Sequence, residues 1–259
     1  MSFKHTQMKV KGNTALLIMD SPPVNALGAE LKKELAERLD DLEKREEIWT
    51  VILTAAGKKI FAAGADIPSL LDLDYEGGLA RVKETRRLFS KVANLEKPTI
   101  AAINGTCLGA GLELALCCDL RIAADHVRLG LPEVNLGIMP GAGGTQRLPR
   151  IINPGLARYL IYTGSTLIPE DALSYGLVTM VVPYGSLMEE AEKVADKINE
   201  KGPLAVRAAK KAISQGCALP LEEGLSLENE LWANLCHTED KREGISAFLE
   251  KRKSKFKGK

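Results

Sequence analysis

The sequence is poor in aromatic residues, has almost no net charge and lacks a long uninterrupted apolar run. Aromatic residues make up 5% of the 259 positions, and 35 Lys and Arg against 34 Asp and Glu leave a formal net charge of +1. With charge balanced, no overall field attracts the chain to nucleic acid or to an anionic membrane. The longest apolar stretch, 99–124, is interrupted by Asn104, Glu113 and Asp119, so it does not indicate a membrane span. We expect a soluble protein that binds any anionic ligand locally.

Motifs for the common cofactors and nucleophiles are also missing. The sequence contains no GxxxxGK[ST] or GxGxxG phosphate loop and no GxSxG elbow, and its three His (His5, His126, His237) lack metal-ligand spacing. Its five Cys include no CxxC pair, and three of them lie in an apolar segment. Such cysteines are typical of buried thiols in a reducing compartment. Because the first 13 residues show no secretory signal, we expect a cytoplasmic location.

The pattern of apolar residues predicts an α/β fold. The β-rich runs TALLIMD (14–20) and TVILTAA (50–56) flank a segment, 27–46, with apolar residues at helical spacing. A second helix around 76–95 precedes further short strands, whereas from about 143 most segments read as helices with Pro or Ser at the start and Gly at the end. We predict one unit over 1–200 and an entirely helical region over 201–259.

Glu113 is a carboxylate in a segment, CLGAGLELALCCD (107–119), whose other positions favour burial. An isolated buried charge is costly, so this side chain needs a partner, a water-filled pocket or a substrate. The N–H groups at the start of a helix offer partial compensation. From this segment alone, a carboxylate stabilised by its helix end and a catalytic carboxylate are both open.

Two further stretches combine small residues, mostly Gly and Ala, with an acidic side chain. LPEVNLGIMPGAGGTQR (131–147) offers Glu133 in a glycine-rich loop, although Pro-Glu is also an ordinary helix start. IFAAGADIPSL (60–70) has Gly64 where a backbone can approach a ligand closely, as CLGAGLE does around Ala110. Loops of this kind can aim free N–H groups at an oxyanion, and each alone is equally compatible with a tight turn.

Taken together, FAAGAD, AAINGTCLGAGLELALCCD and PEVNLGIMPGAGGTQRL resemble the crotonase superfamily, and specifically its enoyl-CoA hydratases. The similarity extends from SPPVNAL (21–27) to REGISAFLEKRKSKF (242–256), which is nearly the whole chain. The resemblance implies a spiral of ββα units with a C-terminal helical trimerisation region, and a homo-trimer or a homo-hexamer built as a dimer of trimers. The partner would be an acyl-CoA thioester, with no nucleic acid, membrane, metal or separate cofactor.

The resemblance also assigns roles to residues. The thioester carbonyl would bind between the backbone N–H groups of Ala65 and Ala110, the second of which is more often Gly in this family. Glu113 would deprotonate a water beside the β-carbon and Glu133 would supply a proton at the α-carbon, while Gly141 would help to place the water. The implied reaction is the reversible hydration of a trans-2-enoyl-CoA to a 3-hydroxyacyl-CoA.

Contacts to the remainder of the ligand are implied by the same resemblance. Ala63, Asp66 and Ile67 match a loop beside the adenine and pantetheine, where Pro68 replaces a frequent Lys. Positions that approach the substrate tail or the nucleotide, including that of a neighbouring subunit, are matched by Trp232, Phe248 and Lys251. Residues 68–95 are expected to shape the acyl pocket. The basic tail KRKSKFKGK (251–259) is either a solvated, fraying end or an attractor of CoA phosphates.

Other functions remain open at this point. Isomerases that resemble this family keep only the second acid, because moving a double bond needs one proton shuttle; Glu113 therefore favours hydration over isomerisation. Thioester hydrolysis is a further reaction of such folds. A non-catalytic scaffold or RNA-binding protein would leave both acids and both donor loops unexplained.

Overall fold

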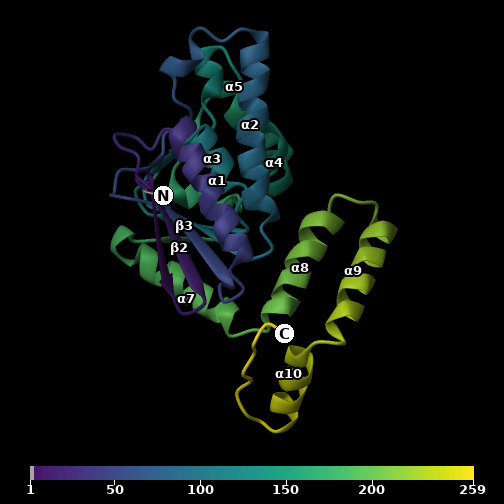
Figure 1. Cartoon of the computed structure of the whole chain (residues 1–259). Helices are drawn as coiled ribbons and strands as arrows, with labels where there is room; N and C mark the ends of the chain where they lie inside the picture. The colour runs from purple at the N-terminus through teal and green to yellow at the C-terminus, as the bar shows by residue number, and fades with distance from the viewer. Residues whose placement is uncertain (1–2) are drawn as a thin grey trace.

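The computed structural model describes residues 3–259 and contains two β-sheets with helices around them (Figure 1). The larger sheet has the order β1-β2-β3-β5-β7-β10. Its strands are β1 (Thr6–Lys11), β2 (Thr14–Met19), β3 (Thr50–Ala55), β5 (Thr99–Ile103), β7 (Leu120–Ala124) and β10 (Met180–Val182). β1 is antiparallel to β2, and the other neighbours are parallel. All residues of β3 and β5 are buried, as expected for parallel strands covered on both faces.

The smaller sheet has the order β4-β6-β8-β9. Its strands are β4 (Ile60–Ala62), β6 (Thr106–Leu108), β8 (Leu129–Gly130) and β9 (Thr166–Leu167). Each of the first three follows a strand of the larger sheet and precedes a helix: β3-β4-α2 (Tyr75–Asn94), β5-β6-α3 (Ala110–Ala115) and β7-β8-α4 (Gly144–Ile151). The chain therefore makes three consecutive ββα turns, and the predicted α/β spiral is confirmed.

Four further α-helices complete the body. These are α1 (Ala29–Lys44), α5 (Pro154–Thr163), α6 (Pro169–Ser174) and α7 (Leu187–Asn199). Three of them, α1, α6 and α7, pack on the large sheet, whereas α5 packs on α4. α1 packs against β1, β2 and α2, while α7 packs against β2, β3, β5 and β7. Leu31, Leu35, Leu39 and Leu42 make the buried stripe of α1, which is the i, i+4, i+8 pattern of an amphipathic helix. Within residues 3–259, no helix is long and apolar enough to cross a membrane.

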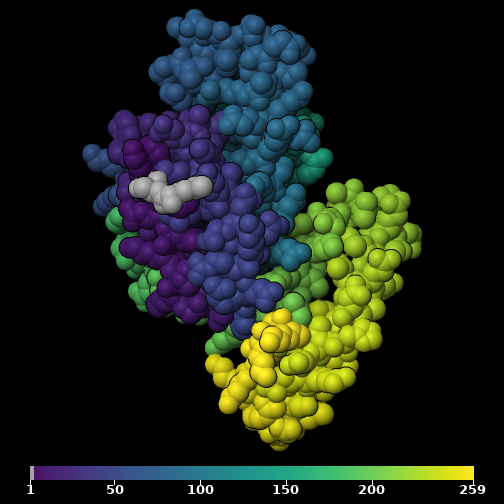
Figure 2. All heavy atoms as spheres, in the orientation of Figure 1, coloured from purple at the N-terminus to yellow at the C-terminus, as the bar shows by residue number. Residues whose placement is uncertain are grey.

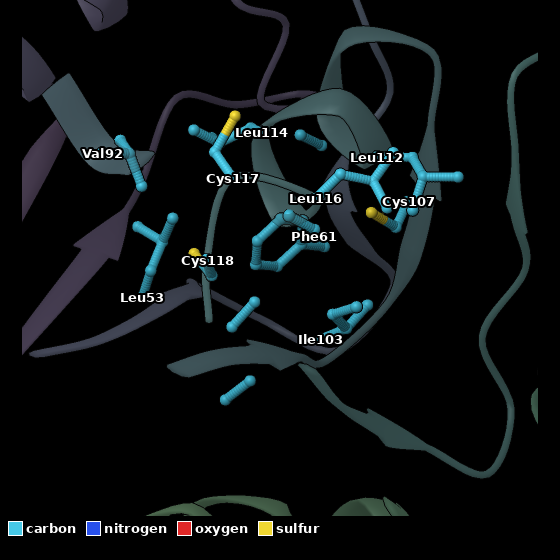
Figure 3. Close-up of a cluster of buried hydrophobic side chains, with 14 of the residues drawn as sticks. Leu53, Phe61, Val92, Ile103, Cys107, Leu112, Leu114, Leu116, Cys117 and Cys118 are labelled. Atoms are coloured by element: carbon cyan, nitrogen blue, oxygen red, sulfur yellow. The ribbon is translucent and has the colours of Figure 1, made fainter. Parts of the chain in front are cut away.

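The core between the two sheets is densely packed around α3. Figure 3 shows Phe61 of β4 among Ile103, Leu112 and Leu116. Cys107, Cys117 and Cys118 are buried free thiols in the same cluster, whereas Cys217 is exposed. The prediction of buried thiols is thus correct for the apolar segment and wrong for Cys217, which lies just beyond the end of a surface helix.

Asn104 and Gly105 fix the corner between β5 and β6. The Asn104 side chain donates to the carbonyls of Ala55 and Gly57, both at 2.8 Å, and accepts from the Ala55 N–H at 3.3 Å. A Cβ on Gly105 would lie 2.3 Å from the Ile60 nitrogen. Because no side chain fits there, the turn can pack directly on the start of β4, and this contact joins the large sheet to the small one.

The chain beyond residue 200 forms three helices that project to one side of the body (Figures 1 and 2). α8 (Pro203–Gly216) is attached through Lys210, whose Nζ lies 2.8 Å from Asp119 Oδ2 and 2.9 Å from the Lys97 carbonyl. α9 (Leu221–Leu235) has no buried residue, and α10 (Glu239–Leu249) follows it. The predicted C-terminal helical region is confirmed, although it is not entirely helical, because α10 ends at Leu249 and residues 250–259 form no helix. Its standing as a separate domain stays a prediction.

The last residues, 250–259, fold back on α10. The Asp240 carboxylate accepts from the N–H groups of Lys257 and Gly258 at 2.7 and 2.8 Å. Arg252 forms an ion pair with Glu243 at 2.7 Å. Most side chains of this tail are exposed to solvent, as one of the two alternatives expects, while a buried aspartate and an ion pair hold the segment against α10.

Replacing Gly111 by Ala is expected to destabilise the protein by about 1–3 kcal/mol, measured as the free energy of unfolding in urea. The reason is that a Cβ on Gly111 would lie 2.3 Å from the Ala62 carbonyl oxygen. Gly78→Ala is the matched control in another helix, where no atom lies within 4 Å and helix propensity predicts a gain of up to about 1 kcal/mol. Equal effects of the two substitutions would contradict the argument.

Candidate active site

The three glycine-rich loops meet at one edge of the small sheet. They follow β4, β6 and β8, which are parallel neighbours, so their carboxyl ends lie together. Gly64 and Gly109 have φ values of +104° and +54°, which favour glycine. A Cβ on Gly109 would lie 3.6 Å from Gly64 Cα, and one on Gly64 would lie 3.3 Å from the Leu108 carbonyl oxygen. The two loops thus pack backbone against backbone.

The loop after β4 is held from outside by the segment 21–27. The Ala63 N–H donates to the Val24 carbonyl at 3.1 Å, and the Leu27 N–H donates to the Gly64 carbonyl at 2.9 Å. The buried Asn25 side chain donates to the Phe61 carbonyl at 3.3 Å. Since both sides of Gly64 are tied to this segment, the direction of the next peptide N–H, that of Ala65, is fixed by backbone bonds.

Ala65 and Ala110 each present an N–H group that donates to no other group within residues 3–259. Ala110 is the first residue of α3, where the N–H has no partner inside the helix. Both residues line the same cavity. Two unpaired donors from adjoining loops are the arrangement that stabilises a developing oxyanion.

Glu113 is 2% exposed and points one oxygen at the start of α4 rather than at its own helix end. Its Oε1 accepts from the N–H groups of Ala142 at 2.8 Å and Gly144 at 2.7 Å. Burial raises the pKa of Glu113, while these hydrogen bonds and the charge of Arg147 oppose the rise. The N-terminus of α4 therefore compensates the buried carboxylate, and Oε2 is left for a group inside the cavity.

Glu133 begins a short 3-10 helix, Glu133–Leu136, directly after β8. Its Oε1 lies 3.2 Å from where a Cβ on Gly109 would be, and its buried Oε2 has no hydrogen-bond partner within residues 3–259. Burial and, to a lesser extent, the charge of Glu113 raise the pKa of Glu133 to about 7. This carboxyl group is therefore ready to hold or release a proton near neutral pH.

A cavity of about 370 Å³ joins these groups. Of the residues singled out from the sequence, its walls include Ala63, Ala65, Ile67, Ala110, Glu113, Glu133 and Gly141. Asp66 adjoins this cavity without lining it. Three predicted ligand contacts do not line the cavity within this chain: Trp232 on α9, Phe248 on α10 and Lys251 just after α10. All three are exposed, Trp232 to 69% and Phe248 to 80%.

Sequence reasoning missed several groups at the cavity. It singled out Gly141 but not Ala142 and Gly144, whose N–H groups bind Glu113. The glycine-rich run PGAGG (140–144) was the sequence feature that could have indicated these N–H donors. The expected wall from 68–95 is present as Leu70, Arg81, Val82 and Thr85. The contribution of Asn135, Leu136, Ile138 and Met139 to the cavity was not foreseen. Within residues 3–259, no three His, Cys, Asp or Glu side chains come together to hold a metal ion.

The raised pKa of Glu133 predicts a pH-dependent stability. The pKa of this carboxyl group is about 7 in the folded protein and about 4.3 in the unfolded chain. The folded protein therefore loses stability as the pH rises from about 4.3 to 7, because folding then opposes the ionisation of Glu133. The full shift corresponds to roughly 4 kcal/mol, and since Glu133 is partly exposed to solvent, screening is expected to reduce it to about half. Glu133→Gln should therefore raise the free energy of unfolding by roughly 1–2 kcal/mol at pH 8, with no difference at pH 4. The exposed Glu46→Gln is the control, and a pH-independent effect of Glu133→Gln would contradict the assignment.

Comparison with known proteins agrees with this site. A family model described as Enoyl-CoA hydratase/isomerase matches residues 9–259. The chain is 39% identical over 254 residues to a short-chain-enoyl-CoA hydratase from Clostridium acetobutylicum, covering 98% of this chain and 97% of the relative. It is 41% identical over 245 residues to 2,3-dehydroadipyl-CoA hydratase from Escherichia coli, covering 94% of each chain.

The fold is equally close to a solved structure. The crystal structure of an enoyl-CoA hydratase from Bacillus anthracis has a TM-score of 0.96 and 42% identity, covering 99% of this chain and 100% of the other. The similarity in sequence and in fold thus extends over nearly the whole chain, including the three loops that form the cavity. The chain belongs to the enoyl-CoA hydratase/isomerase family of the crotonase superfamily.

Proposed function

We propose that this protein catalyses the reversible hydration of a trans-2-enoyl-CoA to a 3-hydroxyacyl-CoA. The observation that carries the proposal is that two carboxyl groups from separate helical elements, Glu113 and Glu133, line the same cavity as Ala65 and Ala110, whose N–H groups have no partner within residues 3–259. Hydration needs a base for water, an acid for the α-carbon and donors for the thioester oxygen. The cavity offers one group for each need.

The reaction begins with the thioester carbonyl between the N–H groups of Ala65 and Ala110. Attack of water on the β-carbon pushes the electrons of the double bond towards the carbonyl, which places negative charge on its oxygen. Donors already fixed by backbone hydrogen bonds stabilise that charge without reorganising, and one such donor is typically worth about 3–4 kcal/mol. The chemistry requires no separate cofactor.

The two acids have complementary roles in proton transfer. Glu113 takes a proton from the attacking water through its free Oε2, while Oε1 stays bound to Ala142 and Gly144. Glu133, whose pKa is raised to about 7, delivers a proton to the α-carbon. Gly141, on the cavity wall beside Ala142, helps to place the water. In dehydration the roles reverse, and because the acids interact, their titrations are coupled.

Isomerisation is the second candidate, since the family covers both reactions. Moving a double bond between carbons needs a proton shuttle but no activated water. Glu133 alone would serve that purpose. A second carboxylate, buried at the cavity and compensated by the start of another helix, favours hydration because it has no role in isomerisation.

We further propose a homo-trimer, or a hexamer formed by two trimers, as the working form. Large apolar side chains are exposed along the C-terminal helices, among them Ile213, Leu221, Trp232 and Phe248. Such a surface is typical of a subunit interface. Burial of these helices against neighbouring subunits would bring Trp232, Phe248 and Lys251 towards an adjacent acyl-CoA. The five free cysteines fit a reducing, cytoplasmic environment.

Glu113→Gln and Glu133→Gln are each expected to lower the turnover of crotonyl-CoA by a factor of at least about 10². Each substitution removes one proton-transfer group and keeps the shape of the side chain. Loss of the enoyl thioester absorbance measures turnover, and calorimetry with butyryl-CoA shows whether binding persists. Near wild-type turnover in either variant would refute the two-acid assignment, whereas turnover of 3-enoyl-CoA alone by the wild type would favour isomerisation.

The proposed oligomer predicts a solution mass of three or six times the 28.1 kDa of the chain. Trp232→Glu should lower that mass, because it places a charge in the apolar face of α9. Multi-angle light scattering after size-exclusion chromatography measures the mass. Lys9→Glu, at an exposed position of β1, is the control, and a monomeric wild type would contradict the proposal.

A further inference from the structure

Arg81 is a third charged residue of the cavity, and the hydration of an enoyl thioester does not use it. The charged side chains on the cavity wall are Glu113, Glu133 and Arg81. Arg81 lies on α2, in the ββα turn that precedes both acids, and is partly buried. It therefore comes to the cavity from a different element than the proton-transfer groups.

This part of α2 packs against the loop before α4, whose N–H groups donate to the Glu113 carboxylate. Val82 Cγ1 lies 3.0 Å from where a Cβ on Gly141 would be. Thr85, one turn after Arg81, also lines the cavity, and its hydroxyl donates to the Arg81 carbonyl at 3.0 Å. Arg81, Val82 and Thr85 thus form a wall of the cavity that an acyl chain would meet beyond the reacting carbons.

The Arg81 guanidinium has no anionic partner in the described part of the chain. No carboxylate within residues 3–259 lies within 4.0 Å of it. The neighbouring cation Lys32 is already paired with Glu84 at 2.9 Å. The cation that lowers the pKa of Glu113 is Arg147, so Arg81 is not needed to balance the acids either.

The surroundings of Arg81 are mostly apolar. Leu70, Val82, Ile138 and Met139 line the same cavity. A wall of this kind suits the methylene groups of an acyl chain, and a lining arginine without a carboxylate partner within residues 3–259 favours a ligand that ends in an anion. Arg presents a planar fork of donors that matches a carboxylate in two parallel hydrogen bonds.

We propose that Arg81 binds a carboxylate at the far end of the acyl chain, so that the preferred substrates are short enoyl-CoA thioesters of dicarboxylic acids. This inference rests on the proposed hydration and specifies its substrate class. The carboxylate reaches Arg81 while the thioester oxygen lies at Ala65 and Ala110. An uncharged acyl chain of equal length leaves the guanidinium unpaired and binds less tightly.

The test compares crotonyl-CoA with glutaconyl-CoA and 2,3-dehydroadipyl-CoA in the wild type, Arg81→Met, Arg81→Lys and Arg86→Met. We expect the wild type to favour a carboxylated substrate in kcat/KM, and Arg81→Met to lose about 10- to 100-fold with that substrate and little with crotonyl-CoA. Arg81→Lys should retain part of the preference. Arg86→Met is the control, because Arg86 lies on the same helix but lines a separate groove beside α1.

Binding distinguishes failure of this inference from failure of the proposed reaction. Calorimetry with the saturated thioesters butyryl-CoA and glutaryl-CoA should show tighter binding of glutaryl-CoA to the wild type, and no such difference in Arg81→Met, even if no enoyl-CoA is turned over. If Arg81→Met lost the same affinity for butyryl-CoA as for glutaryl-CoA, the inference would be overturned and Arg81 would be assigned to the CoA phosphates. Equal affinities in the wild type would also overturn it.

Discussion

Gly64, Gly109 and Gly111 allow the loops after β4 and β6 to pack backbone against backbone, and the geometry of the cavity depends on this contact. A side chain at Gly111 would collide with the Ala62 carbonyl, and one at Gly64 would press on Leu108. The close approach sets the spacing of the two peptide N–H groups that follow the glycines. It also fixes the start of α3, and with it the direction of Glu113.

The buried Glu113 carboxylate links this contact to the next turn of the spiral. Its partners are peptide N–H groups at the start of α4, so a charge on one ββα unit is compensated by the backbone of the following unit. The Glu133 Oε2 has no hydrogen-bond partner among residues 3–259. The two carboxyl groups consequently lie in different environments within one cavity, which is what their proposed roles as base and acid at the same pH require.

Much of this arrangement was predictable from the sequence. The segments 14–20, 50–56 and 76–95 showed their strands and helix through periodicity, and the three glycine-rich motifs carried the resemblance that implied the spiral. The small sheet was not visible, because β4, β6 and β8 are two or three residues long and too short for any period. Its parallel register is nevertheless what brings the motifs together.

A site residue was predictable where its chemistry differs from that of its sequence neighbours. Glu113 stood out in an apolar segment, whereas Arg81 lies among charged residues of an exposed helix, and only the packing of α2 reveals which of its faces borders the cavity. The peptide groups of Ala142 and Gly144 carried no side-chain signal at all. The folded-back tail likewise depends on Asp240, which is distant enough in sequence to escape any local pattern.

The two unpaired N–H groups have a consequence for how the family can diversify. Because the donors at Ala65 and Ala110 belong to the peptide backbone, no side-chain replacement other than proline deletes them. Selection can therefore alter the residues at these two positions, and the acids and walls around them, while the proposed donors to a thioester oxyanion persist. New reactions can arise on this scaffold without a change in the position of these two N–H groups, provided that the flanking glycines are retained.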